Sequence, residues 1–157
     1  TASFAFFFYG TLCDADVRRT VIGRDAPVSP AGLESYEAVP VEHGRFPILL
    51  FQSGRTAAGV ACEGLSLEEA ARLGLYENEG RDYTARQFPV REPGGAVRRV
   101  WVFLPTGALR RGPGRWDLAE WQRFAKADFL ARVARRMRAV EARELAPLIE
   151  IWRGRAA

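Results

Sequence analysis

The chain has 157 residues, of which 48% are hydrophobic and 27% charged, and its formal net charge is +4. This length predicts a single domain over residues 1–157, with enough apolar side chains for one core. No stretch approaches the roughly 18 consecutive apolar residues of a membrane helix, and the Phe-rich start lacks the features of a signal peptide. One histidine and two distant cysteines give neither metal-ligand spacing nor a disulfide framework, so we expect a cytoplasmic protein without metal or cofactor.

The first half of the chain predicts four strands and one short helix. Residues 3–9 are almost all apolar, which is typical of a strand buried on both faces. Asp14 is suited to cap a short helix that ends at Gly23. Further strands are expected at residues 33–41, 48–51 and 57–63, with a turn at 52–55 between the last two.

The second half predicts a capped helix, a β-hairpin and a long helix. Ser66, followed three residues later by Glu69, is a capping-box arrangement and opens a helix that leads into an acidic loop. Strands at residues 83–90 and 97–104 are joined by a Pro-Gly-Gly turn. Apolar residues recur at helical spacing over residues 118–140, which predicts one helix packed against the sheet.

The order of these elements defines the expected fold. The strands do not alternate regularly with helices, which argues against a doubly wound parallel sheet. We therefore predict an α+β protein with a mixed, strongly curled β-sheet or barrel of about six strands, short helices and a long C-terminal helix. The barrel core would span about residues 3–104 and the C-terminal helical segment about residues 116–142.

A turn at Tyr9-Gly10-Thr11-Leu12 directly follows the first predicted strand. Glycine at this position lets the backbone turn sharply and approach a ligand closely, and successive amides there can face one concavity and bind an anion. The N-terminus of the helix capped by Asp14 would point at the same place. These features suit a carboxylate or the oxyanion of an attacked carbonyl, although the four residues taken alone also fit an ordinary turn.

Two glutamates, Glu77 and Glu79, follow the helix opened by Ser66. A carboxylate just beyond an apolar helix, flanked by Leu75 and Tyr76, can lie in a partly dry pocket. Burial of that kind raises the pKa of a carboxyl group and makes it a usable base at neutral pH. The alternative for this segment is a solvated acidic loop.

Together the two segments resemble the γ-glutamyl cyclotransferase-like superfamily, in particular its γ-glutamylamine cyclotransferase-like branch. The Tyr-Gly-Thr-Leu turn after an apolar strand is similar to the family's substrate loop. The Tyr76-Glu77 segment, with Tyr and Arg following, is similar to its catalytic-glutamate segment, and Phe46-Pro47 to its aromatic-Pro loop, where Tyr is commoner than Phe. The resemblance covers about residues 4–104.

The resemblance leaves two positions open for the catalytic glutamate. Leu73 is followed by Gly74, where the family usually has Asp. Alignment on the Tyr-Glu pair nominates Glu77, whereas alignment on a Glu-Gly pair nominates Glu79. Glu77 is our first choice because it keeps the distance from the helix, and Glu79 is the second.

The resemblance also implies a reaction. A cyclotransferase of this kind releases an amine from a γ-glutamyl amide by intramolecular attack of the substrate's α-amine on its γ-carbonyl, which forms 5-oxoproline. No metal, cofactor or covalent nucleophile is needed, and Glu77, or Glu79 in its place, would act as general acid and base. The implied substrate-binding residues are Tyr9, Gly10, Thr11, Leu12, Phe46, Pro47, Tyr83 and Arg86. Arg86 fits a surface position on its strand equally well.

Other interpretations stay open from the residues alone. A non-catalytic small-molecule binding or regulatory module could use the same fold and cavity, and a thiol enzyme would require Cys13 and His43 to meet. The arginine-rich residues after Gly107 could contact nucleic acid or an acidic lipid surface, but a solvated helix face explains them more simply. The expected partner is therefore a small-molecule γ-glutamyl substrate, with neither nucleic acid nor membrane. The sequence defines neither the leaving amine nor the choice between monomer and homodimer.

Overall fold

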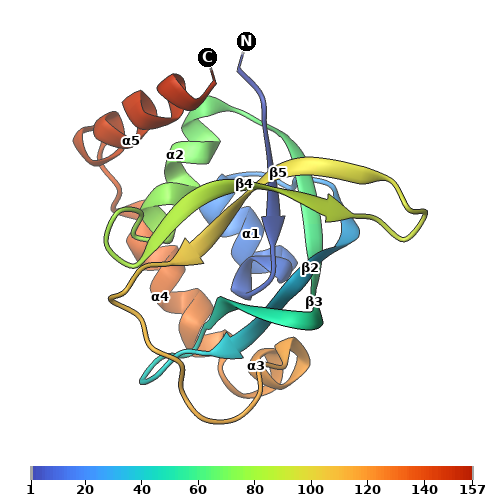
Figure 1. Cartoon of the computed structure of the whole chain (residues 1–157). Helices are drawn as coiled ribbons and strands as arrows, with labels where there is room; N and C mark the ends of the chain where they lie inside the picture. The colour runs from blue at the N-terminus through green and yellow to red at the C-terminus, as the bar shows by residue number, and fades with distance from the viewer. Residues whose placement is uncertain (1, 157) are drawn as a thin grey trace.

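The computed structural model describes residues 2–156, in which five strands close into a barrel in the order β1-β3-β2-β4-β5 (Figure 1). The strands are β1 (Phe4–Phe8), β2 (Val28–Pro40), β3 (Pro47–Leu65), β4 (Tyr83–Arg91) and β5 (Val97–Pro105). The helices are α1 (Ala15–Ile22), α2 (Leu67–Tyr76), α3 (Leu118–Phe124), α4 (Lys126–Arg138) and α5 (Ala142–Arg155), with a 3-10 turn, η1 (Thr11–Cys13), after β1. Within this described range no helix has both the length and the hydropathy needed to cross a membrane. The expected α+β architecture with a curled sheet is confirmed.

A long antiparallel ribbon of β2 and β3 forms much of the barrel wall. β1 pairs antiparallel with β3 and parallel with β5, so the sheet is mixed and closes on itself. The turn expected at residues 52–55 falls where the ribbon changes register, since Glu34 pairs with Thr56 and Tyr36 with Phe51. An irregularity of this kind bends a strand without ending its pairing. The two strands expected on either side of it are therefore one strand, β3, and the barrel has one strand fewer than predicted.

β1 is buried on both faces, as its apolar sequence predicts. Phe4, Phe6 and Phe8 belong to a core shared with the helices, whereas Phe7 and Tyr9 belong to a second core of strand residues. Because successive side chains of a strand point to opposite faces, this short strand joins both cores. The turn that follows it is consequently fixed in position.

The two predicted helix starts are confirmed. The Asp14 carboxylate accepts hydrogen bonds from the amides of Asp16 (2.9 Å) and Val17 (3.0 Å) at the start of α1. Ser66 and Glu69 form a reciprocal capping box at the start of α2. Each cap satisfies amides that would otherwise lack a partner at a helix N-terminus.

The C-terminal segment is helical, but it is not one long helix. It breaks at Ala125 (φ −122°, ψ −21°) between α3 and α4, and α5 follows beyond the predicted segment. α4 packs mainly against α1 rather than the sheet, and Lys126 at its start contacts both Asp14 (2.8 Å) and Asp16 (2.7 Å). α5 lies along α2 (Figure 1) and buries Trp152 completely.

Candidate active site

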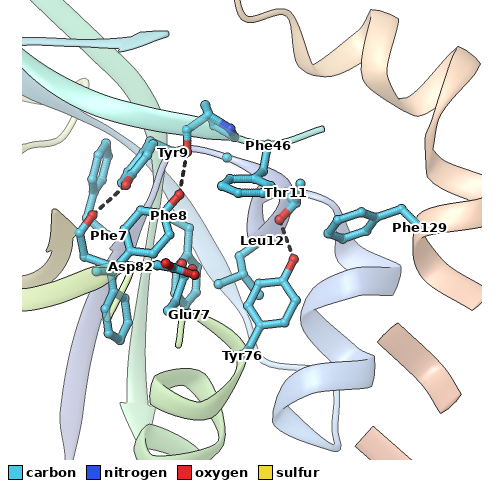
Figure 2. A pocket seen from close by; sticks show the side chains of 14 residues that line it. Phe7, Phe8, Tyr9, Thr11, Leu12, Phe46, Tyr76, Glu77, Asp82 and Phe129 are labelled. Carbon is cyan, nitrogen blue, oxygen red and sulfur yellow. Dashed lines mark hydrogen bonds between the residues drawn. The ribbon is translucent and has the colours of Figure 1, made fainter. Parts of the chain in front are cut away.

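A cavity of about 200 Å³ opens beside the end of β1, between the turn that follows it, the C-terminal end of α2 and the start of β3 (Figure 2). Most of its wall is aromatic, and Glu77 and Asp82 are its acidic members. The lining residues are Phe7, Phe8, Tyr9, Gly10, Thr11, Leu12, Phe46, Pro47, Tyr76, Glu77, Asp82, Tyr83, Phe103 and Phe129. The structure thus brings together the N-terminal turn, the aromatic-Pro loop and the glutamate segment that the sequence singled out.

The turn after β1 is held in place from two sides. A Cβ added to Gly10 would lie 2.7 Å from Cγ of Pro47, so only glycine permits this close approach between the turn and the start of β3. On the other side, buried Arg18 donates from Nη1 to the carbonyl oxygen of Leu12 (3.0 Å). Thr11 and Leu12 are the first two residues of η1, and amides at the start of a helix have no intrahelical partner.

Glu77 lies at the C-terminal end of α2, where its amide still bonds to the carbonyl of Leu73 (2.9 Å). Asn78 and Gly80, with φ angles of 51° and 93°, then turn the chain back toward β4, in a conformation that Asn and Gly adopt with little strain. Burial, and next the negative charge of Glu79, raise the pKa of Glu77 to about 8. A carboxyl group with such a pKa can both accept and return a proton near neutral pH.

Two tyrosines on the wall are tied to the backbone. The Tyr9 hydroxyl donates to the carbonyl of Phe103 (2.5 Å), and the Tyr83 hydroxyl donates to the carbonyl of Pro47 (2.8 Å). Burial, followed by the charge of Glu77, raises the pKa of both phenols above the ordinary value. Both therefore remain neutral at physiological pH and serve as fixed wall groups rather than bases.

A third tyrosine, Tyr76, connects the glutamate segment to the turn. Its hydroxyl shares a hydrogen bond of 2.6 Å with Oγ1 of Thr11, as Figure 2 shows. The ring of Phe129 from α4 packs edge-on against Tyr76, with centroids 6.4 Å apart. This contact explains why a helix from the C-terminal segment contributes to the cavity.

Glu79 lies outside the cavity. Its side chain is only 4% exposed, and its Oε2 lies 2.5 Å from Nη2 of Arg155 on α5. The guanidinium group of Arg155 in turn lies over the ring of Trp152, 4.3 Å from its centroid. Of the two glutamates considered, the cavity is lined by Glu77.

Arg86, one of the expected substrate-binding residues, does not line the cavity. Side chains alternate between the two faces of a strand, and on β4 Tyr83 and Ala85 are buried while Arg86 is exposed. An odd spacing from Tyr83 places Arg86 on the opposite face of β4, the face that carries Phe88 and Val90. Arg86 therefore has the exposed position on its strand that was the alternative to a contact with substrate.

Several residues of the cavity wall could not be assigned to the site from the sequence. From the sequence, Tyr76 is recognisable only as a flank of the glutamate, and Phe129 only as part of an apolar helical stripe.

The alternative of a thiol enzyme that uses Cys13 and His43 has no support from the geometry. Cys13 donates from Sγ to the carbonyl of Phe8 (3.1 Å), and its pKa is raised to about 11, mainly by burial. His43 lies on an exposed turn, 3.1 Å from a carboxylate oxygen of its neighbour. No Cys–His pair forms between these two residues.

A family model described as "Gamma-glutamyl cyclotransferase, AIG2-like" matches residues 6–123. The chain belongs to this family. The match to the gamma-glutamyl cyclotransferase family includes the barrel except the first two residues of β1, the glutamate segment and most of α3, and it ends before α4 and α5. The resemblance noted in the sequence is thereby confirmed. No curated protein is similar enough to match the chain.

Solved structures of the same fold extend the likeness beyond the family match. A gamma-glutamyl cyclotransferase superposes with a TM-score of 0.62 at 14% identity, covering 94% of this chain and 98% of that one. An uncharacterized protein from Homo sapiens gives a TM-score of 0.65 at 14% identity, covering 96% of this chain and 99% of that one. The solution structure of a protein from Arabidopsis thaliana gives a TM-score of 0.63 at 23% identity, covering 87% of this chain and 82% of that one. At these identities the likeness shows the fold.

Proposed function

We propose that this member of the gamma-glutamyl cyclotransferase family converts a γ-glutamyl amide into 5-oxoproline and a free amine. The observation that carries the proposal is Glu77, a carboxyl group with a pKa of about 8 on the wall of a cavity next to the Gly10–Leu12 turn. At about 200 Å³ the cavity is smaller than the roughly 300 Å³ at which typical small-molecule pockets begin. It therefore suits an amino-acid-sized group such as γ-glutamyl, with the amine portion outside.

In the first step, the α-amine nitrogen forms a bond to the γ-carbonyl carbon of the same molecule. An α-amine has a pKa of about 7.7–8.0, close to the value of about 8 for Glu77, so Glu77 is matched to remove its proton. Holding the two reacting groups of one molecule at the right distance can contribute about 7–11 kcal/mol. The aromatic wall would supply that constraint by allowing only a folded glutamyl group.

In the second step, the carbonyl oxygen carries negative charge while the bond from carbon to the leaving nitrogen breaks. The amides of Thr11 and Leu12 are suited to bind an oxyanion or the substrate carboxylate, because nothing within η1 uses them. Protonated Glu77 gives its proton to the departing nitrogen, and the carboxylate is restored. The attacking nitrogen then loses its second proton to the restored carboxylate, which passes it to the released amine. Atoms and protons balance in this way without a metal or a covalent intermediate.

The departure from the family pattern at Gly74 has a packing cause that supports this proposal. A Cβ at Gly74 would lie 2.9 Å from Oε1 of Glu79 and 3.3 Å from both Leu148 and Trp152. The small residue thus makes room for the Glu79–Arg155 pair and for α5. Its presence does not require that the site has lost catalytic function.

The test is product analysis with a panel of γ-glutamyl amides. We expect 5-oxoproline and free amine in equal amounts. Free glutamate in place of 5-oxoproline would indicate attack by water rather than by the α-amine and would overturn the mechanism. Absence of 5-oxoproline from every amide in the panel would overturn the proposed function.

A further inference from the structure

A second hollow, of about 580 Å³, adjoins the cavity and shares Phe46 and Phe129 with it. Figure 2 shows these two rings at the edge of the cavity that faces α4. The hollow is lined by His43, Gly44, Arg45, Phe46, Asp128, Phe129, Ala131, Arg132 and Arg135. We call this hollow the outer groove. A molecule that fills the cavity and is longer than a glutamyl group would extend past Phe46 and Phe129 into it.

The outer groove is positively charged. Three arginines, at positions 45, 132 and 135, line it together with one aspartate, Asp128. Arg45 lies 4.0 Å from Asp128, and both side chains are exposed. In the part of the chain that the structure describes, residues 2–156, neither Arg132 nor Arg135 forms an ion pair with a carboxylate. Two guanidinium groups are therefore available to an anionic ligand.

Arg132 and Arg135 also lie on the cavity side of α4. They are three residues apart, so they share one face of the helix, and Arg132 is a further three residues from Phe129. The guanidinium carbon of Arg132 lies 5.9 Å from the centroid of the Phe129 ring. Phe129 thus links the wall of the cavity to the two free arginines. Both arginines lie beyond residues 6–123, the segment that the family model matches.

We propose that the amine released from the substrate carries an acidic group, a carboxylate or a phosphate, which binds to Arg132 and Arg135. This inference rests on the proposed function, because it concerns the part of the γ-glutamyl amide that leaves. Guanidinium groups bind both anions through charge-assisted hydrogen bonds. A polyamine or another cationic leaving group would be repelled in the same groove.

The test compares substrates that differ in the charge of the leaving amine. γ-Glutamylglycine carries a carboxylate, γ-glutamylglycinamide is its neutral counterpart, and the γ-glutamyl amides of phosphoethanolamine and ethylenediamine carry a phosphate and a cation. We expect kcat/KM to be about tenfold higher for an anionic substrate than for the neutral one, which corresponds to about 1.4 kcal/mol. The carboxylate and phosphate arms identify which anion the groove prefers.

The variant Arg132→Gln/Arg135→Gln should lose this preference while it keeps the rate on γ-glutamylglycinamide, which also confirms that it folds. Arg138→Gln is the matched control, since Arg138 is an exposed arginine of the same helix that does not line the outer groove, and it should keep the preference. Equal rates for all four substrates, or a preference that survives in the double variant, would overturn the inference while the proposed function stands. If no substrate yields 5-oxoproline, both fall.

Discussion

Glu79→Gln should lower the pKa of Glu77, because the negative charge of Glu79 is the second cause of its elevation after burial. The rise runs from an ordinary value of 4.5 to about 8, and since burial is the larger cause, Glu79 accounts for less than half of it. Part of the charge of Glu79 is already offset by Arg155, whose Nη2 lies 2.5 Å from Oε2 of Glu79. We therefore expect the titration midpoint of Glu77 to fall by about one pH unit, which corresponds to about 1.4 kcal/mol.

Arg155→Gln is the matched perturbation, and its expected effect has the opposite sign. It leaves the charge of Glu79 in place without its partner, so the pKa of Glu77 should rise further. Each replacement breaks the same largely buried ion pair, and each should reduce the free energy of unfolding by about 3 kcal/mol or less. The two variants thus share their structural damage and differ in the direction of the electrostatic change.

Carbon NMR of the protein with labelled glutamate side chains would measure these midpoints directly in the absence of substrate. A Glu77→Gln sample identifies the signal of Glu77 by its disappearance. Midpoints that move in the same direction in both variants would refute the assignment of Glu79 as a cause. A wild-type midpoint near the ordinary 4.5 would refute the dry environment of Glu77 altogether.

Three further predictions concern stability and access to the cavity. Since folding raises the pKa of Glu77 from 4.5 to about 8, its contribution to stability is lost as pH rises through that range. Between about pH 5 and about pH 9 the unfolding free energy of the wild type should therefore fall by about 2 kcal/mol relative to that of Glu77→Gln, after allowance for solvent screening. Chemical denaturation of both proteins at several pH values would measure this difference. Burial alone would raise the pKa of Asp14, but hydrogen bonds from Lys126 and other donors hold it below its ordinary 3.8. Lys126→Met should therefore lose about 2–4 kcal/mol of unfolding free energy in urea at neutral pH, and this loss should disappear as pH falls below the ordinary value. Gly10→Ala forces a Cβ against Pro47, and kcat/KM for 5-oxoproline release should fall by about a hundredfold, because displacement of a positioning wall is costly.

Each of these three predictions has a matched control. Glu68→Gln removes an exposed carboxylate from the same helix as the Glu77 segment and should show no gain at high pH. Lys126→Arg keeps the cation and should retain most of the stability. Gly94→Ala adds a Cβ that meets nothing within 4 Å and should leave kcat/KM unchanged. A control that behaves like its variant would contradict the corresponding argument.

The parts of the site that the sequence predicted are those with local causes. The strand before Gly10 ends in a turn because glycine follows an apolar run. α2 begins directly after Ser66 because Ser66 and Glu69 form its capping box within four residues. Both signals act over a few residues and do not depend on the rest of the fold. The cavity forms between these two segments, so its main features could be predicted once both were recognised.

The parts that the sequence did not predict depend on contacts between distant segments. β3 continues through residues 52–55 because β2 pairs with it on both sides of the irregularity. α5 went unrecognised although Leu145, Leu148 and Trp152 have helical spacing, and its stability comes from burying Trp152 against β1 and β5. The orientation of Arg86 was available from strand alternation alone. The role of Phe129 was not, since it depends on where α4 packs.

The most direct test of the account is 5-oxoproline release by Glu77→Gln measured beside the wild type and Glu79→Gln on one γ-glutamyl amide. The account predicts that Glu77→Gln, still folded, loses at least about a hundredfold in kcat, the lower range for a general acid and base. Glu79→Gln should retain turnover, with a pH profile shifted to lower pH. Full activity in Glu77→Gln would contradict the central claim, and inactivity of Glu79→Gln beside it would transfer the role to the other glutamate.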